Sequence, residues 1–221
     1  MDKRTKLHLP KISDIILTAI GAVLCGVGCG FENFASLGMD AVGSFYDGIR
    51  IILGLSLESI GTVSLAVTAV LLIFLLIVDR RYVSIGTVIY MVLYSISANA
   101  GTKLLELLVH TEALPVKILI AVTGFAMLSA GLGIYIAVDI GVDAFTGVTL
   151  WITDKLHKDL KYVKIACDLV LMVAGILLGA RIGLFTVVSV LSGGPAIEFC
   201  TKKVQRIYIR HMIRKARRTP S

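Results

Sequence analysis

The chain reads SLGMDAVGSF from Ser36 to Phe45 and DIGVDAFTGV from Asp139 to Val148. Both stretches contain Gly, one further residue and then Asp-Ala, and they lie 103 positions apart. In each, the acidic residue follows a long apolar segment. Because Asp favours the first position of a helix, this pattern predicts a long helix that gives way to a shorter one. The sequence therefore predicts the same transition, from a long helix to a short one, at two places.

The repeat extends beyond these two phrases. At an offset of 103, Gly28 aligns with Gly131 and Gly30 with Gly133. Further along the chain the offset shrinks to 99, which aligns Thr87-Val88 with Thr186-Val187 and Asn99 with Glu198. A shorter loop in the second half explains the difference of four residues. These matches indicate a duplicated unit.

The composition is that of a membrane protein. The chain is 57% hydrophobic and only 17% charged, with a mean hydropathy of +0.89. Residues 59–78, 82–102 and 118–138 contain no charge over 20, 21 and 21 positions. A bilayer core of roughly 30 Å needs about 20 apolar residues in a helix. Because these runs lack period-two alternation, we expect an all-α integral membrane protein.

We expect six transmembrane helices and two short segments. The spans are 12–37, 59–78, 83–108, 116–138, 162–180 and 183–202, and the short segments are 41–54 and 143–156. The predicted parts are an N-terminal segment (1–11), a first repeat of three spans (12–110), a second repeat (111–202) and a basic tail (203–221). Each short segment is a helix or a re-entrant element after the first span of its repeat. A unit with three spans must insert in opposite directions, so the repeats are inverted.

The basic residues set the orientation. With the N-terminus in the cytoplasm, 18 of the 22 Lys and Arg residues fall in cytoplasmic segments. We therefore expect a multi-pass protein of the bacterial cytoplasmic membrane with both termini inside, and the first apolar segment as a retained span. The partner is the lipid bilayer, and the basic tail either binds anionic headgroups or acts as a topology anchor. This distribution of charge speaks against nucleic-acid binding.

Three stretches resemble a known family. They are SLGMDAVGSFYDGI with its echo DIGVDAFTGV, then RRYVSIGTVI, and finally GARIGLFTVVSVLSGGPAIEF. The chain resembles the YczE/YyaS/YitT-type bacterial membrane proteins over about residues 15–199. Ala41 and Ala144 stand where those proteins often have Pro, and the terminal domain of YitT-type members is absent. The resemblance implies this membrane fold more than an activity, although some members are linked to secondary-metabolite production or export.

The repeated phrase is the leading candidate site. Asp40 and Asp143, with the neighbouring Gly38 and Gly141, are expected to bind an ion, a proton or a small solute where the helices break. The alternative is that both aspartates are N-caps of the short segments, which is compatible with a role in lining a pathway.

Other polar residues in or near the spans extend this list. Charges in a membrane cost at least about 2.5 kcal/mol each on insertion scales, so those that persist are functional candidates or lie at the interface. The further binding candidates are Glu32, Asn33, Asp139, Asn99 and Glu198, the last of which is expected to pair with Lys202. Gly193, Gly194 and Pro195 predict a break and a candidate hinge in the last span.

No enzyme is predicted, and neither a metal nor a cofactor is expected. Cys25 and Cys29 are four residues apart but have no His partners, so we interpret them as packing residues. Fold-level analogy with inverted-repeat proteins favours a small-solute or ion transporter. The alternative is a non-transporting membrane regulator or partner subunit, and a homo-oligomer remains open.

Overall fold

The computed structural model describes residues 12–110, 113–138 and 140–216. Every regular element in these ranges is helical. The helices are α1 (Ile12–Ala35), α2 (Ala41–Ile52), α3 (Ile60–Val78), α4 (Ile85–Leu108), α5 (Leu114–Val138), α6 (Ala144–Leu156), α7 (Leu160–Leu177) and α8 (Leu184–Ala216), with short 3-10 turns η1 (Leu57–Ser59) and η2 (Arg80–Tyr82). The expected all-α class is confirmed for the described part of the chain.

Five helical segments are long and apolar enough to cross a bilayer. They are Ile12–Ala35, Leu57–Val78, Ile85–Leu108, Leu114–Val138 and Leu184–Ile207. Helix α7, where a further span is predicted, is not one of them, because its 18 residues include Lys161, Lys164 and Asp168. The apolar residues face outward as well as inward: Leu177 and Leu184 are both 81% exposed. Such surfaces suit lipid, as expected of an integral membrane protein.

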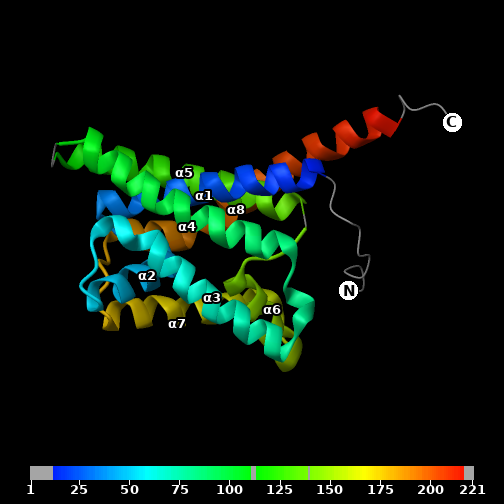
Figure 1. The fold of residues 1–221 in the computed structure, drawn as a ribbon, viewed down its shortest axis with the longest axis horizontal. Helices are drawn as coiled ribbons and strands as arrows, with labels where there is room; N and C mark the ends of the chain where they lie inside the picture. Colours follow the sequence, from blue (N-terminus) through cyan, green and yellow to red (C-terminus); the bar gives the residue numbers. More distant parts are fainter. Residues whose placement is uncertain (1–11, 111–112, 139, 217–221) are drawn as a thin grey trace.

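The helices form two layers. In Figure 1, α1, α4, α5 and α8 lie together in the upper layer, and α2, α3, α6 and α7 lie below them. Helix α1 packs most extensively against α4 and α5, and α5 also packs against α8. In the lower layer α2 packs on α7, and α6 contacts both α3 and α7. The short helices α2 and α6 lie toward opposite ends of the molecule (Figure 1).

Glycines let α1 and α5 cross closely. A Cβ on Gly21 would lie 2.9 Å from the carbonyl oxygen of Gly131, and one on Gly28 would lie 2.5 Å from that of Gly124. These pairings make the two helices antiparallel. Between them, the thiol of Cys25 donates to the carbonyl of Leu128, 103 positions later, at 3.5 Å. Small residues therefore set the helix spacing, which is how membrane helices commonly associate.

Equivalent contacts recur in the two halves of the chain where the long helices end. Gly38 has a φ of +108°, and a Cβ there would overlap the hydroxyl of Thr186. Gly141 lies against Ser84 and Thr87 in the same manner, and the Thr87 hydroxyl donates to the carbonyl of Val142 at 2.7 Å. Each break thus packs against the start of the last helix in the other half of the chain. Gly38 and Gly141 are close-approach positions in the structure.

Candidate functional site

Asp40 and Asp143 cap the two short helices. One oxygen of the Asp40 carboxyl accepts the backbone N–H of Gly43 at 3.0 Å, and Asp143 accepts that of Thr146 at the same distance. Both aspartates have extended backbone, as an N-cap requires. The structure therefore gives the predicted capping alternative for both residues. Capping uses one oxygen of each carboxyl.

Glu32 is the most unusual polar residue of the spans. It lies eight residues before Asp40, in the last turns of α1, and its exposed fraction is 0%. Neither of its carboxyl oxygens makes a hydrogen bond. The backbone of Asp40 approaches the carboxyl without meeting hydrogen-bond geometry. A charged carboxylate without a partner is costly in an apolar interior, which makes Glu32 a candidate for binding a proton or a cation.

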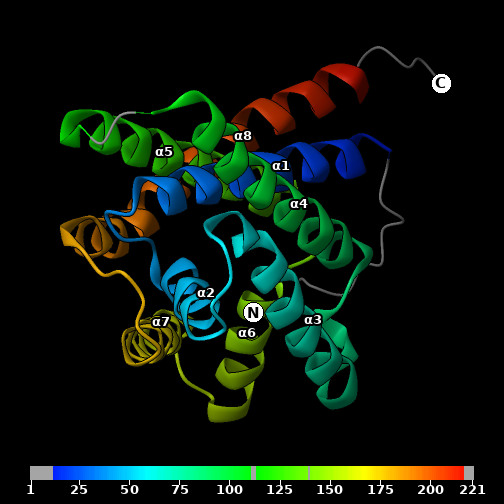
Figure 2. The same cartoon turned by 60° about the vertical axis from the view of Figure 1, so that its left-hand side comes forward.

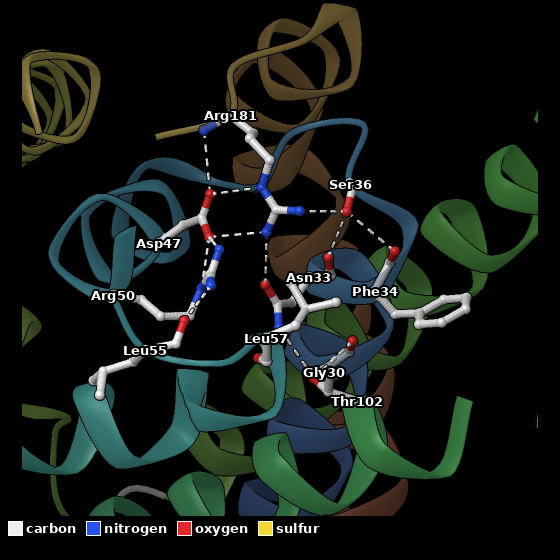
Figure 3. Close-up of polar contacts among 10 residues, drawn as sticks. All are labelled: Gly30, Asn33, Phe34, Ser36, Asp47, Arg50, Leu55, Leu57, Thr102 and Arg181. Carbon is white, nitrogen blue, oxygen red and sulfur yellow. Dashed lines mark hydrogen bonds and ion pairs between the residues drawn. The ribbon is translucent and has the colours of Figure 1, made fainter. Parts of the chain in front are cut away.

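A buried ion-pair network closes one end of the molecule. Asp47 in α2 is 2% exposed and accepts from Arg50 one turn later, at 2.7 and 3.0 Å. The guanidinium of Arg181, in the loop between α7 and α8, also reaches Asp47, at 3.0 and 3.2 Å. Figure 3 shows the Asp47 carboxyl between the two arginines. The Arg181 pair therefore ties α2 to a segment 134 residues away, whereas the Arg50 pair lies within α2.

The network continues into α1. Arg181 also donates to the hydroxyl of Ser36 at 2.5 Å and to the side-chain oxygen of Asn33 at 3.3 Å (Figure 3). The amide nitrogen of Asn33 donates in turn to the carbonyl of Leu57 and to the hydroxyl of Thr102. Asn33, a predicted site residue, is thus fully satisfied by protein groups. Its position joins the ends of α1, α3 and α4 at one side of the molecule.

The charges of the network act on Asp47. Burial alone would raise the pKa of this carboxyl, but hydrogen bonds and charge from Arg181, with Arg50, outweigh it and hold the pKa below the ordinary value of 3.8. Asp47 is therefore a carboxylate at neutral pH. This cluster is therefore suited to link segments of the chain by ion pairs, as a latch, rather than to carry protons.

The opposite end of the molecule is held more weakly. The hydroxyl of Tyr82, after α3, donates to the carboxylate of Asp154 in α6, where Tyr82 is half-buried and Asp154 is exposed. Burial, with the Asp154 hydrogen bond and charge, raises the pKa of Tyr82 to about 12, so its hydroxyl remains a donor. Nearby, Trp151 packs edge-on to Phe74 with ring centroids 5.4 Å apart. No buried ion pair links α6 to its neighbours among the described residues.

The remaining predicted site residues do not join Glu32. Asn99 accepts the backbone N–H groups of Gly61 and Thr62 at 2.6 and 3.2 Å, so it caps the start of α3. Glu198 pairs with Lys202, as expected from their spacing, and both side chains are 64% exposed. Asp139 lies outside the described residues. Asn99 and Glu198 therefore have structural partners in different parts of the fold.

The predicted break in the last span is wrong. Helix α8 continues through Gly193, Gly194 and Pro195 from Leu184 to Ala216. Pro removes one backbone donor, and the small residues before it leave space: a Cβ on Gly194 would meet nothing within 4 Å.

Sequence reasoning missed the pairing of Asp47 with Arg181. The i, i+3 spacing of Asp47 and Arg50 was readable as a helical pair. Arg181 was one of the four basic residues that the predicted orientation places outside the cytoplasm, which was the available signal. No local pattern links positions 134 apart, so only the fold could bring them together.

Among the described residues no group of three His, Cys, Asp or Glu side chains is arranged to hold a metal ion. The chain belongs to the family of unknown function DUF6198, which matches residues 12–202. No curated protein matches the chain. No solved structure matches it either.

Proposed function

We propose that the protein is a small-solute or ion transporter of the bacterial cytoplasmic membrane, built from two inverted repeats of three spans. Helices α1–α4 form one repeat and α5–α8 the other, with α7 as the sixth span and both termini in the cytoplasm. The α1–α5 contacts support this arrangement, because the 103-residue offset of the repeat converts the Gly21–Gly131 contact into the Gly28–Gly124 contact. The matching caps at Asp40 and Asp143 support it as well. The likeness to the YczE/YyaS/YitT-type proteins is part of the same proposal.

Glu32 carries the proposal. An apolar residue would stabilise the fold more than a fully buried carboxyl whose two oxygens have no partner. Residues of this kind within membrane spans commonly belong to ion or proton pathways. Glu32 also precedes the break between α1 and α2, where inverted-repeat transporters place their sites. In our proposal Glu32 binds a proton or cation, and the helix break admits the solute.

The unequal ends of the molecule support a gated pathway. The Asp47–Arg181 pair and its neighbours lock the end that the proposed orientation places outside. The cytoplasmic end is joined by the exposed Tyr82–Asp154 hydrogen bond. In the proposed transport cycle the outer latch opens when the solute is exchanged on that side. The structure would then correspond to the outward-closed state.

A thermal-stability screen tests this function. The purified protein is heated with a panel of metabolites and ions at several pH values, beside Glu32→Gln. A ligand that binds only the folded state raises the melting temperature by mass action. We expect a shift with the wild type that Glu32→Gln loses, because Gln keeps the shape of the side chain and removes its charge and acidic proton.

Glu58→Gln is the matched control, since it makes the same substitution at a carboxyl that is 42% exposed and pairs with Lys103. Shifts that survive in Glu32→Gln would place binding away from this residue and contradict the proposed site. A panel without any shift would favour the alternative, a non-transporting membrane regulator or partner subunit. In that case Glu32→Gln should be as stable as the wild type or more so.

A further inference from the structure

A pocket of about 600 Å³ lies between α3, α6 and α7. This volume is within the range of about 300–1,000 Å³ typical of small-molecule sites. Its walls are mainly apolar: Leu71 comes from α3, Phe145 and Ile152 from α6, and Val163 and Leu171 from α7. Figure 2 shows α6 between the other two helices.

Unequal packing of the short helices produces this pocket. Helix α2 fits closely on α7, where a Cβ on Gly48 would lie 2.8 Å from the carbonyl oxygen of Gly175. Helix α6, its counterpart by the repeat, packs less extensively on α3 and α7. The space that α2 closes at one end of the molecule therefore stays open beside α6. In the proposed orientation the open end faces the cytoplasm.

Basic residues line the mouth of the pocket. Lys158, just before α7, lines it and makes no ion pair with the described residues. One turn inside α7, Lys164 pairs with Asp168 at 2.5 Å, and both also line the pocket. The lining thus carries two cations and one anion, and the uncompensated charge at its outer edge is positive. An anionic head complements that edge, and an apolar body complements the walls.

The lining of the pocket borders α2. Phe145, on the pocket wall, packs edge-on to Tyr46 of α2 with ring centroids 5.8 Å apart. Lys164 and Asp168, which also line the pocket, act electrostatically on the Asp40 carboxyl at the break between α1 and α2.

We propose that this pocket binds a small amphipathic organic anion, with its head at Lys158 and its apolar body against α6 and α7. The inference rests on the proposed transport function, because it names the substrate class that enters from the cytoplasmic side. Binding itself requires only the pocket. Its test is therefore separate from the test of transport.

The chain supplies two natural probes for the experiment. Trp151, the only tryptophan, is in α6, and Cys167, a free and partly exposed thiol, lines the pocket. The protein in phosphatidylcholine nanodiscs is titrated with octyl sulfate, and with octyltrimethylammonium as the matched cation. Tryptophan fluorescence is recorded, and modification of each thiol by a maleimide is followed by mass spectrometry. Cys200 in α8, also free and partly exposed but outside the pocket, is the internal control.

We expect octyl sulfate to change the fluorescence saturably and to protect Cys167 but not Cys200. Lys158→Gln should weaken this binding about tenfold, the effect of losing one charge-assisted contact. Lys155→Gln, on the same exposed surface but outside the pocket lining, should leave it unchanged. Octyltrimethylammonium should bind at least tenfold more weakly.

Equal binding of the anion and the cation, or equal protection of both thiols, would overturn the proposal. If phosphatidylglycerol in the nanodisc protects Cys167 and displaces octyl sulfate, the occupant is a membrane lipid, and the small-anion assignment is wrong. Saturable octyl sulfate binding, beside a thermal screen in which no ligand shift depends on Glu32, would reject the proposed transport site and keep the pocket, whereas the reverse result would reject the pocket alone.

Discussion

The Asp47 carboxylate should be among the most costly side chains to remove. Asp47→Ala deletes the acceptor of five hydrogen bonds from Arg50 and Arg181, including one from the Arg181 backbone. Breaking a buried ion pair typically costs about 3–5 kcal/mol, because the partner charge is left unpaired. The Arg181 side chain is 35% exposed and water compensates it in part, so we expect about 3 kcal/mol.

The assay is the thermal unfolding of the purified protein. A loss of 1 kcal/mol lowers the melting temperature by about 2–4 °C in a chain of this size, so Asp47→Ala should lower it by about 6–12 °C. Arg81→Ala is the control, because its pair with Asp79 is a surface one with the arginine side chain 74% exposed. It should shift the melting temperature by only about 2 °C. Equal shifts for the two variants would refute the reasoning that burial makes the Asp47 network strong.

The remaining predictions concern pH, helix packing and capping. Because the folded-state pKa of Asp47 is lowered, its contribution is present in full above the ordinary pKa of 3.8 and is lost as the pH falls through the folded value; melting temperatures below pH 5 should fall more steeply for the wild type than for Asp47→Asn. Gly28→Ala puts a carbon 2.5 Å from a backbone oxygen of α5 and should lower the free energy of unfolding by about 1–3 kcal/mol. Gly194→Ala, where a Cβ meets nothing within 4 Å, should be neutral or stabilising. Equal melting temperatures for the two variants would contradict this. Asp40→Ala should cost about 1 kcal/mol through its lost cap, and Asp40→Asn should keep most of it, so equal losses in thermal unfolding would show that the charge matters more than the cap.

The local features of the fold could be predicted from the sequence. Uncharged runs of about 20 residues identify α3, α4 and α5, because membrane helices require continuous apolar segments. The Gly-x-Asp-Ala phrases identify the starts of α2 and α6, because Asp favours the cap position. Helix α7 was predicted from its apolar residues, but its three charges separate it from the five clear membrane-spanning segments.

The long-range features could not be predicted in this way. Pro195 predicted a break, yet an unbroken helix tolerates one missing donor where its neighbours leave room. Glu32 was identifiable as a charge within a span, but its lack of any partner depends on what α1 packs against. The pairing of Asp47 with Arg181 and the pocket beside α6 likewise depend on how distant helices meet. The residue pattern along the chain does not show which distant helices pack together.

Access of water to Glu32 from both sides of the membrane tests the central claim most directly. Glu32→Cys is made in a background without the four native cysteines and is treated with a membrane-impermeant thiol reagent, from outside in intact cells and from inside in inverted vesicles. Because the site is fully buried in this structure, labelling reports the opened states of a transport cycle. Our account predicts labelling from both faces. Labelling from neither face, or from one face only, would contradict alternating access at Glu32.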